Sequence, residues 1–361
     1  RLPSRSSRSS WRGGSMSSVV AKNFGHAKWH LGRSSNSGVT ATVFGAYGFI
    51  GRYIVNRLAR SGARVVVPYR GDDYDVKHLK VMGDLGQIVP YEMSIRSYEQ
   101  MQQAVAGSNV VINLLGKPFE TNRFDFDQIN VHFPRALGAI CTELGVDRVV
   151  HMSALGASSG APSKWLRTKF LGEAALHEEF PNATILRLAT VVGMEEKFMT
   201  KTAELAKMLP LTLQLGSPTA KQQPVYCLDV AAAVQAVLMR EEALGQTYAI
   251  AGPRVYTNDE LYDFIFKTIR RPKSAVVLPL HIQAAIGSLI GMMPKPLITR
   301  HMVQTMTADL TAPSHMPGLR ELGIAPTPME EVALQFLKRF RPPGSQTVEE
   351  LSKLPYNAQN L

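Results

Sequence analysis

The chain has 361 residues, of which 45% are hydrophobic and 19% are charged, and its formal net charge is +11. A chain of this length and composition can bury a core of about 200–250 residues, so it is not an intrinsically disordered protein. The positive excess lies wholly in residues 1–71, which carry twelve Lys or Arg and no acid, and the nearly neutral remainder argues against a nucleic-acid-binding groove.

Residues 1–36 form a basic segment that is rich in Ser, Arg and Gly. This composition is typical of a mitochondrial or chloroplast transit region, or of what processing leaves of it. The alternative is a solvated tail that has no function after import. Either way, we expect these residues to lie outside the folded domain.

The first predicted strand, Thr40–Phe44, leads directly into a glycine-rich loop and then a helix. The three glycines of this loop allow a tight turn and let the backbone approach a pyrophosphate at the N-terminus of the helix. The sequence therefore predicts a dinucleotide-binding loop. Its predicted contact residues are Gly45, Tyr47, Gly48, Phe49, Ile50 and Gly51.

Six further short apolar segments alternate with helical stretches along the chain. This alternation predicts an α/β protein with a Rossmann-like, doubly wound parallel sheet. Asp229 is expected to cap the helix before the last strand, and Thr257–Glu260 has capping-box spacing for a helix that ends near Ile269. The six predicted strands are Ala63–Val67, Gln87–Tyr91, Asn109–Asn113, Arg148–Met152, Thr184–Leu188 and Thr247–Ile250.

The end of the second strand indicates which nucleotide fits. An NAD-selective fold places an acid there, about 20 residues beyond the glycine loop, to accept the ribose hydroxyls. This chain has Pro68, Tyr69 and Arg70 instead, which favours a 2′-phosphate and therefore NADPH or NADP+. Arg52 directly follows the last glycine and is a second candidate for that phosphate, although each arginine taken alone is also compatible with a solvated surface position.

Cysteine and histidine spacing predicts neither a disulfide framework nor a metal site. Cys141 and Cys227 have no C-x-x-C or Cys/His ligand spacing and are expected to be buried thiols of a reducing compartment. His132, His151 and His177 likewise have no ligand spacing and are expected to be structural or surface residues.

These features resemble the atypical or extended short-chain dehydrogenase/reductase family over about residues 38–270. The resemblance rests on the glycine loop, on Asn113–Gly116 after the fourth strand, on Ser153 after the fifth, and on Lys169. Within that family the chain is most similar to the nucleotide-binding accessory subunits of mitochondrial respiratory complex I. The segments that carry this closer similarity are Gly32–Gly38, Val67–Arg70, Met82–Gln87, Ser108–Leu114, Asn122–Phe126, Gln223–Tyr226 and Pro317–Leu319.

The resemblance implies further cofactor contacts. It implies that Lys169 bonds the nicotinamide ribose. The acid that meets the adenine amino group in the family is replaced here by Ser94, so that contact is expected to be weaker or reversed in polarity. Beyond the glycine loop, the expected cofactor-binding residues are Arg52, Arg70, Ser94, Leu114, Leu115, Gly116, Ser153 and Lys169.

The proton donor of the reductase family is missing. Where the family carries Tyr-x-x-x-Lys, this chain has Trp165 four residues before Lys169. In the family the phenol passes a proton to the carbonyl oxygen while the nicotinamide delivers hydride. An indole offers an N–H donor of very high pKa and no acceptor, and residues 152–180 contain no tyrosine, so the chain is expected to be catalytically silent and no catalytic residue is predicted.

Residues 274–294 carry no charged side chain, yet prolines and glycines argue against a membrane-spanning helix. Within His281–Met293 the apolar residues Ile282, Ala285, Ile286, Leu289, Ile290 and Met293 form one helical stripe. An interfacial helix or a partner-docking face fits this pattern, and the alternative is a helix that covers the protein's own core.

The predicted domains are a basic segment at 1–36, an NADP(H)-binding Rossmann domain at 37–275, a helical partner-facing or membrane-facing region at 276–340 and an extended tail at 341–361. The resemblance implies an accessory subunit of complex I on the matrix side of the mitochondrial inner membrane. It would hold a structural NADP(H) for assembly and stability, contact subunits near the quinone-binding region and touch the membrane peripherally. Two alternatives are an active NADP-dependent reductase or epimerase that uses another proton donor, and an RNA-binding relative of the fold, against which the nearly neutral body argues.

Overall fold

The computed structural model describes residues 37–342 except 122, 292, 294–295 and 297, so the basic segment 1–36 and most of the tail lie outside the described residues. A parallel sheet of seven strands forms the centre, in the order β11-β6-β5-β4-β1-β2-β3. Because the order reverses between β1 and β4, the carboxyl ends of these two strands diverge and leave room for a ligand. The strands are β1 Thr40–Phe44, β2 Arg64–Tyr69, β3 Ile88–Glu92, β4 Val110–Asn113, β5 Arg148–Ala154, β6 Thr184–Leu188 and β11 Thr247–Ile250.

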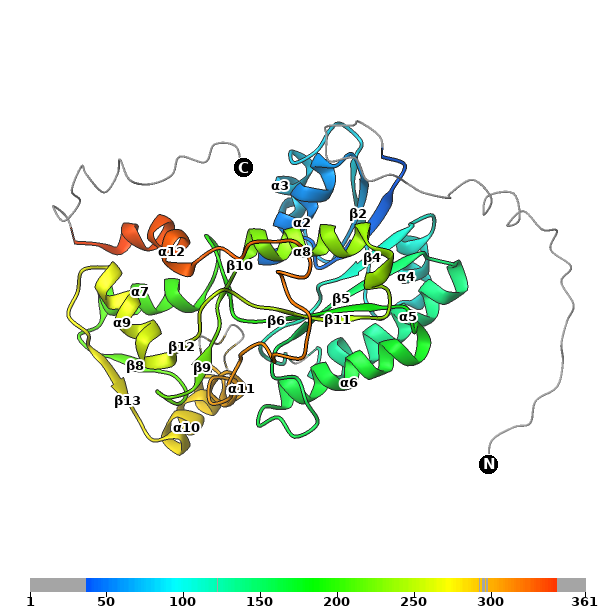
Figure 1. Ribbon diagram of the computed structural model, residues 1–361. Helices are drawn as coiled ribbons and strands as arrows, with labels where there is room; N and C mark the ends of the chain where they lie inside the picture. Colours follow the sequence, from blue (N-terminus) through cyan, green and yellow to red (C-terminus); the bar gives the residue numbers. More distant parts are fainter. Residues whose placement is uncertain (1–36, 122, 292, 294–295, 297, 343–361) are drawn as a thin grey trace, which may run out of the picture.

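Helices cover both faces of this sheet (Figure 1). Alternate strand residues point to opposite faces, so Val43 joins the core beneath α2 and α8 whereas Phe44 joins the core beneath α4, α5 and α6. The α/β doubly wound fold predicted from the sequence is confirmed. The helices around the sheet are α2 Phe49–Arg60, α3 Lys77–Lys80, α4 Tyr98–Val105, α5 Phe133–Leu144, α6 Lys164–Glu179 and α8 Cys227–Met239, with short turns at Asp73–Val76, Gln128–His132 and Glu241–Ala243.

A second, smaller core lies beside the sheet, at the left of Figure 1. It packs α7, α9 and α12 around Tyr262, Phe266 and Phe336, and it takes residues from both sides of residue 275, where the sequence predicts the C-terminal region to begin. The remaining elements are α7 Phe198–Met208, α9 Asn258–Thr268, α10 Leu280–Ile290, α11 Arg300–Thr305, α12 Met329–Leu337 and the turn Lys338–Phe340. Three short pairs complete it: β7 Val191–Val192 with β10 Val225–Tyr226, β8 Thr212–Gln214 with β13 Ala275–Val277, and β9 Lys221–Gln222 with β12 Tyr256–Thr257.

Two predicted helix starts have different outcomes. The capping box at α9 is confirmed, since Thr257 and Glu260 exchange side-chain and backbone hydrogen bonds. The prediction that Asp229 is an N-cap is wrong, because α8 begins two residues earlier and Asp229 lies in its first turn. Its carboxylate instead accepts hydrogen bonds from the amide and hydroxyl of Thr327, over 2.7 and 3.1 Å, and so fastens the C-terminal segment to the Rossmann domain.

The apolar stripe predicted after residue 281 lies on α10 and faces outward. Leu289 is 72% exposed and Ile282 is 39% exposed, whereas Gln283 and Gly287 are the buried residues of this helix. The alternative in which the stripe covers the protein's own core is therefore wrong. Within the described part of the chain, no helix is long and apolar enough to cross a membrane.

Candidate nucleotide-binding site

The loop between β1 and α2 has the geometry of a phosphate cradle. Gly45 adopts a φ of +81°, in the left-handed region that favours glycine, and its carbonyl accepts a hydrogen bond from the Gly48 amide over 3.1 Å. At Gly51 a Cβ atom would lie 2.5 Å from the carbonyl oxygens of Gly45 and Ala46, so this glycine lets the helix pack on the loop. Gly48 is exposed and leaves the space before the helix open.

The N-terminus of α2 is open toward this space. The helix begins at Phe49 without a side-chain cap and has no acid in its first turn. The amides of a first helical turn have no partner within the helix, and the helix dipole adds positive potential there, so the position favours an anion. Tyr47 and Ile50 pack against the core under α2, and the Phe49 ring meets Tyr53 edge-on, so the backbone of this loop is the part that suits a phosphate.

Arg52 already has an acidic partner. Its Nη1 atom lies 3.1 Å from Oε1 of Glu195, and the Tyr53 hydroxyl donates to Oε2 of the same carboxylate over 2.6 Å. Burial and this hydrogen bond raise the pKa of Tyr53, so the phenol stays protonated and keeps donating. The ion pair with Glu195 thus connects Arg52 to the loop that follows β7.

Arg70 lies at the carboxyl end of β2, where the sequence analysis places the ribose phosphate. It is exposed, and its guanidinium carbon lies 4.8 Å from the centre of the Phe124 ring. The guanidinium of Arg96 lies 4.7 Å from the same ring centre. The sequence analysis missed Arg96 and Phe124, which come from loops that only the folded sheet brings together.

Ser94 follows β3 and occupies the position of the missing acid. Its amide donates to Oε1 of Gln100 over 2.8 Å, and its hydroxyl oxygen accepts from the Arg96 amide over 3.4 Å. A hydroxyl that accepts retains its own proton for donation. Ser94 can therefore donate to a base where a carboxylate could only accept.

At the end of β4 a buried amide positions the next three residues. Oδ1 of Asn113 accepts from the Leu115 amide over 3.0 Å, and its Nδ2 lies 3.1 Å from Nδ1 of His151. Burial, aided by the charge of Lys169, lowers the pKa of His151 well below its usual value, so this ring is neutral and Nδ1 accepts. The backbone from Leu114 to Gly116 is thereby held at the edge of the sheet.

Lys169 reaches this same edge from α6 and is 5% exposed. Its ammonium group donates to the carbonyl oxygens of Leu115, over 3.3 Å, and Met152, over 3.1 Å. Burial lowers the pKa of Lys169 to about 8, against the opposing effect of Glu173. An ammonium has three donors, so one remains for a ligand, and Gly116 leaves room for it because a Cβ there would lie 3.1 Å from Nζ.

Several buried polar atoms near Lys169 have no hydrogen-bond partner among the described residues. They include Nε1 of Trp165, one helical turn before Lys169, Oγ of Ser153, which follows Met152 on β5, and Nε2 of His151. Buried polar groups are normally satisfied, so these atoms remain available to a polar ligand. Together with the open cradle at Gly48, they are compatible with a dinucleotide. Among the described residues, no group of three His, Cys, Asp or Glu side chains could hold a metal ion.

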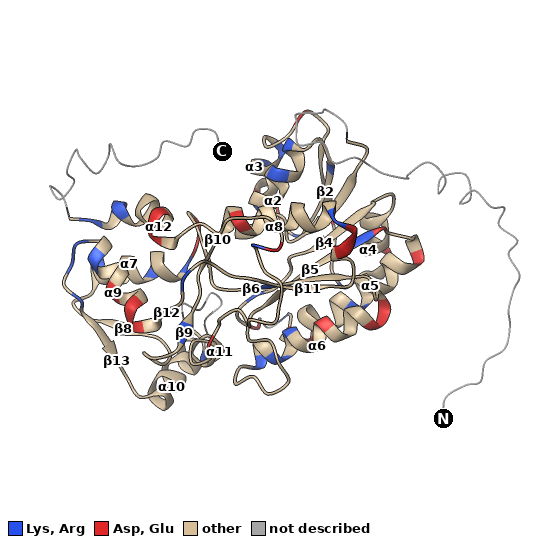
Figure 2. Cartoon of the chain, viewed as in Figure 1, with Lys and Arg blue, Asp and Glu red and all other residues tan. Residues whose placement is uncertain are grey.

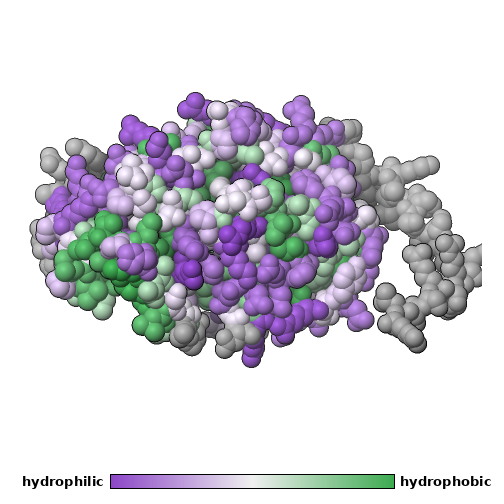
Figure 3. Space-filling model, turned by 90° about the horizontal axis from the view of Figure 1, so that it is seen from below, coloured by the Kyte–Doolittle hydropathy of each residue, from purple (hydrophilic) through white to green (hydrophobic). Residues whose placement is uncertain are grey.

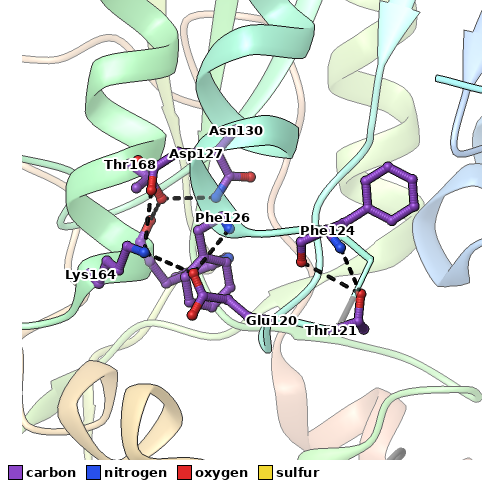
Figure 4. A network of polar contacts seen from close by, with 9 residues as sticks. Glu120, Thr121, Phe124, Phe126, Asp127, Asn130, Lys164 and Thr168 are labelled. Carbon is purple, nitrogen blue, oxygen red and sulfur yellow. Dashed lines mark hydrogen bonds and ion pairs between the residues drawn. The ribbon is translucent and has the colours of Figure 1, made fainter. Parts of the chain in front are cut away.

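A polar network ties the loop after β4 to α6 (Figure 4). The Lys164 ammonium lies 2.9 Å from Oε1 of Glu120 and 3.2 Å from Oδ2 of Asp127. Asn130 donates to the Thr168 hydroxyl over 3.0 Å. Lys164 directly precedes Trp165, and Thr168 directly precedes Lys169. This network therefore holds the loop after β4 in contact with α6, the helix that carries these site residues.

Comparisons with known proteins agree with this geometry. Residues 41–251 match the family model described as the NAD dependent epimerase/dehydratase family. Over 312 residues the chain is 42% identical to "NADH dehydrogenase (ubiquinone) 1 alpha subcomplex subunit 9, mitochondrial" of Mus musculus, which covers 86% of this chain and 82% of the mouse protein. The protein of the same description from Arabidopsis thaliana is 37% identical over 355 residues, covering 94% of this chain and 88% of its own length.

Solved structures share the fold at low sequence identity. The NADPH-dependent quinone oxidoreductase of Escherichia coli, in complex with NADPH, superimposes with a TM-score of 0.64 at 18% identity, covering 82% of this chain and 99% of that chain. The triphenylmethane reductase of Citrobacter gives a TM-score of 0.64 at 16% identity, covering 83% and 99%. At these identities the likeness is one of fold.

Proposed function

This chain belongs to the family of alpha subcomplex subunit 9 of mitochondrial NADH dehydrogenase (ubiquinone), and we propose that it is an accessory subunit of complex I that holds a structural NADP(H). The observation that carries this proposal is an intact nucleotide cradle at the start of α2 in a chain that has Trp165, an indole, where the reductase family has a phenol. The subunit then contributes to assembly and stability of the complex and leaves redox chemistry to other subunits.

NADPH fits the polar groups of the site better than NADH. The amides at the start of α2 receive the pyrophosphate, and Arg70 receives the 2′-phosphate. Lys169, through its remaining donor, bonds the nicotinamide ribose, while Ser153 and the backbone from Leu114 to Gly116 flank it. Bound NADPH is a hydride donor, but in this role it is retained without transferring its hydride.

The absence of the family's proton donor supports a subunit that binds the nucleotide without catalysing a reaction. General acid catalysis contributes about 10²–10⁴ in rate, and the Trp165 indole cannot provide it. The alternative is an active NADP-dependent reductase or epimerase. It is favoured by one observation, the lowered pKa of Lys169 near 8, which would let the lysine itself exchange a proton. Two of the three lysine donors are directed at carbonyl oxygens, and this supports a binding role.

Changing Gly48 to Val is expected to abolish nucleotide retention. The new side chain would occupy the space before α2, where the pyrophosphate approaches the helix, and its Cβ would lie 3.1 Å from the Gly45 oxygen. The measurement is the NADP(H) content of the purified protein, extracted in alkali for NADPH and in acid for NADP+, together with the rise in melting temperature on adding NADPH. The matched control is Gly160→Val, since a Cβ at Gly160 meets nothing within 4 Å. Equal stabilisation of wild type and Gly48→Val by NADPH would show that the cradle is not the site.

An exposed apolar surface on the smaller core is the proposed contact with the rest of the complex. It spans the end of α7, the paired strands β8 and β13, and α10, and it forms the largest green region at one end of the molecule in Figure 3. In Figure 2 the strand β13 and helix α10 carry no charged side chain. Its members are Met208, Leu209, Leu211, Val276, Val277, Leu280, Ile282, Leu289 and Met293, each at least 39% exposed.

Contiguous apolar patches of this kind mark interaction sites on soluble domains. We assign this apolar surface to subunits near the quinone-binding region and to peripheral contact with the inner membrane on its matrix side. Basic residues flank it, among them Lys207 at the end of α7 and Arg271 before β13. Cations beside an apolar face suit an anionic membrane surface.

A further inference from the structure

The carboxyl edge of β2 and β3 carries positive side chains without acidic partners. Tyr69 pairs with Glu92 in the sheet register, so the residues that follow, Arg70 and Arg96, emerge at the same edge. Neither arginine has an ion pair among the described residues. Asp72 and Asp73, which follow Arg70, are engaged elsewhere, as the cap of a turn and as the partner of Lys80.

Both guanidinium groups lie against one aromatic ring. Phe124 is 8% exposed, and its ring centre lies 4.8 Å from the guanidinium carbon of Arg70 and 4.7 Å from that of Arg96. Contact with a ring face orients a planar guanidinium at a small energetic gain. The two like charges repel one another, so an anion that both could reach would stabilise their arrangement.

The loop that carries Phe124 is held in place from two sides. Thr121 and Phe124 exchange backbone hydrogen bonds over 3.0 and 3.1 Å, and Arg96 donates to the carbonyl of Arg123. On the other side, Glu120 accepts from the Phe126 amide and pairs with Lys164, as Figure 4 shows. The ring is therefore a fixed platform.

A pocket of about 290 Å³ opens beside this platform, between α4 and α5. Its lining includes Ile95, Arg96, Met101, Phe124 and Phe133, and so combines apolar and aromatic groups with one cation. The volume is near the lower end of the range for small-molecule sites, about 300–1,000 Å³. Ser94, which replaces the acid expected to recognise adenine, directly precedes Ile95. The pocket therefore offers apolar contacts for a purine next to the position where the acid is missing.

We propose that Arg70 and Arg96 together clamp the 2′-phosphate of the bound dinucleotide, with Phe124 as their common platform and the adjoining pocket as the adenine site. This inference rests on the proposed function and adds Arg96 and Phe124 as determinants of cofactor specificity. Arg96 takes the phosphate role that Arg52 cannot take while it is paired with Glu195. Two guanidinium groups on one phosphate discriminate against a nucleotide that ends in a ribose hydroxyl.

The test measures the affinity of the full-length chain for NADPH and NADH by titration calorimetry, with 2′,5′-ADP and AMP as fragment probes. Arg96→Ala is expected to weaken NADPH and 2′,5′-ADP about tenfold and to leave NADH and AMP within twofold. Arg96→Lys should recover part of the loss, and Phe124→Leu should weaken the phosphorylated ligands by a smaller factor. The control is Arg64→Ala, which removes an exposed arginine at the opposite end of β2.

The outcomes separate this inference from the proposed function. A wild-type chain that binds no dinucleotide contradicts the proposed function itself. A wild-type chain that prefers NADPH, with an Arg96→Ala variant that keeps this preference, overturns only the clamp. Equal loss of NADPH and NADH in Arg96→Ala also overturns it, because the arginine would then act on both ligands alike. Melting temperatures without nucleotide show whether each variant is folded.

Discussion

Replacing Arg70 by Asp is expected to lower NADPH retention more than tenfold and to shift the preference toward NADH. A hydrogen bond to a charged group contributes about 1.5–3 kcal/mol, and 1.4 kcal/mol corresponds to a factor of ten. The substitution removes that contact and places a carboxylate where the 2′-phosphate is expected. The same carboxylate can accept the ribose hydroxyls of NADH, as the acid at this position does in NAD-selective folds. The measurement is the ratio of the two dissociation constants.

The control for this variant is Arg64→Asp. Arg64 is exposed and is the first residue of β2, at the end of the strand opposite to Arg70. Its replacement by Asp therefore makes the same change in charge away from the site. If both variants weakened NADPH equally, the effect would be one of overall charge. If Arg70→Asp left the NADPH content unchanged, the assignment of the 2′-phosphate to the end of β2 would be wrong.

Two charges on the apolar surface are expected to prevent incorporation into complex I. Val277 on β13 and Leu289 on α10 are 43% and 72% exposed, so changing both to Glu costs the isolated chain little stability. Burying two unpaired carboxylates in an apolar interface costs several kcal/mol, enough to lower association by two orders of magnitude or more. The measurement is the amount of assembled complex after the variant replaces the wild-type subunit, read on a native gel.

The matched control is Leu85→Glu. Leu85 lies between α3 and β3 and is fully exposed. In Figure 1, α3 lies far from β13 and α10. The control variant should assemble normally. Normal assembly of the double variant, with an unchanged melting temperature, would show that the complex does not bury this surface.

The central sheet could be predicted from the sequence because its strands are short, continuous apolar runs. A parallel strand covered on both faces favours continuous apolar residues, and Val110–Ile112 and Tyr248–Ile250 show this pattern within β4 and β11. The two-residue strands β7, β9, β10 and β12 give no such signal, because their pairing depends on the surrounding fold. The smaller core could not be predicted either, because it is formed by three segments that lie far apart in the sequence.

Side-chain partners far apart in sequence could not be predicted. Asp229 precedes an alanine-rich stretch, and Asp is a residue type that often caps helices. Its hydrogen-bond partner, Thr327, lies 98 residues away in the sequence. Arg52 pairs with Glu195, 143 residues away, and Arg96 meets Phe124 across two different loops. The glycine loop was predictable because its requirement is local, a turn and a close approach of the backbone within seven residues.

The central claim is that NADPH is held and not used, and the redox state of the bound nucleotide tests it most directly. The purified complex, loaded with NADPH, is supplied with NADH and a quinone, and after many turnovers the NADPH and NADP+ that remain bound are extracted and separated from NADH and NAD+ by chromatography. With the indole of Trp165 in place of the phenol, the account predicts that NADPH stays reduced through many turnovers, and that only a Trp165→Tyr variant given a carbonyl substrate oxidises it. Oxidation of NADPH in the wild-type complex that keeps pace with turnover would contradict the account.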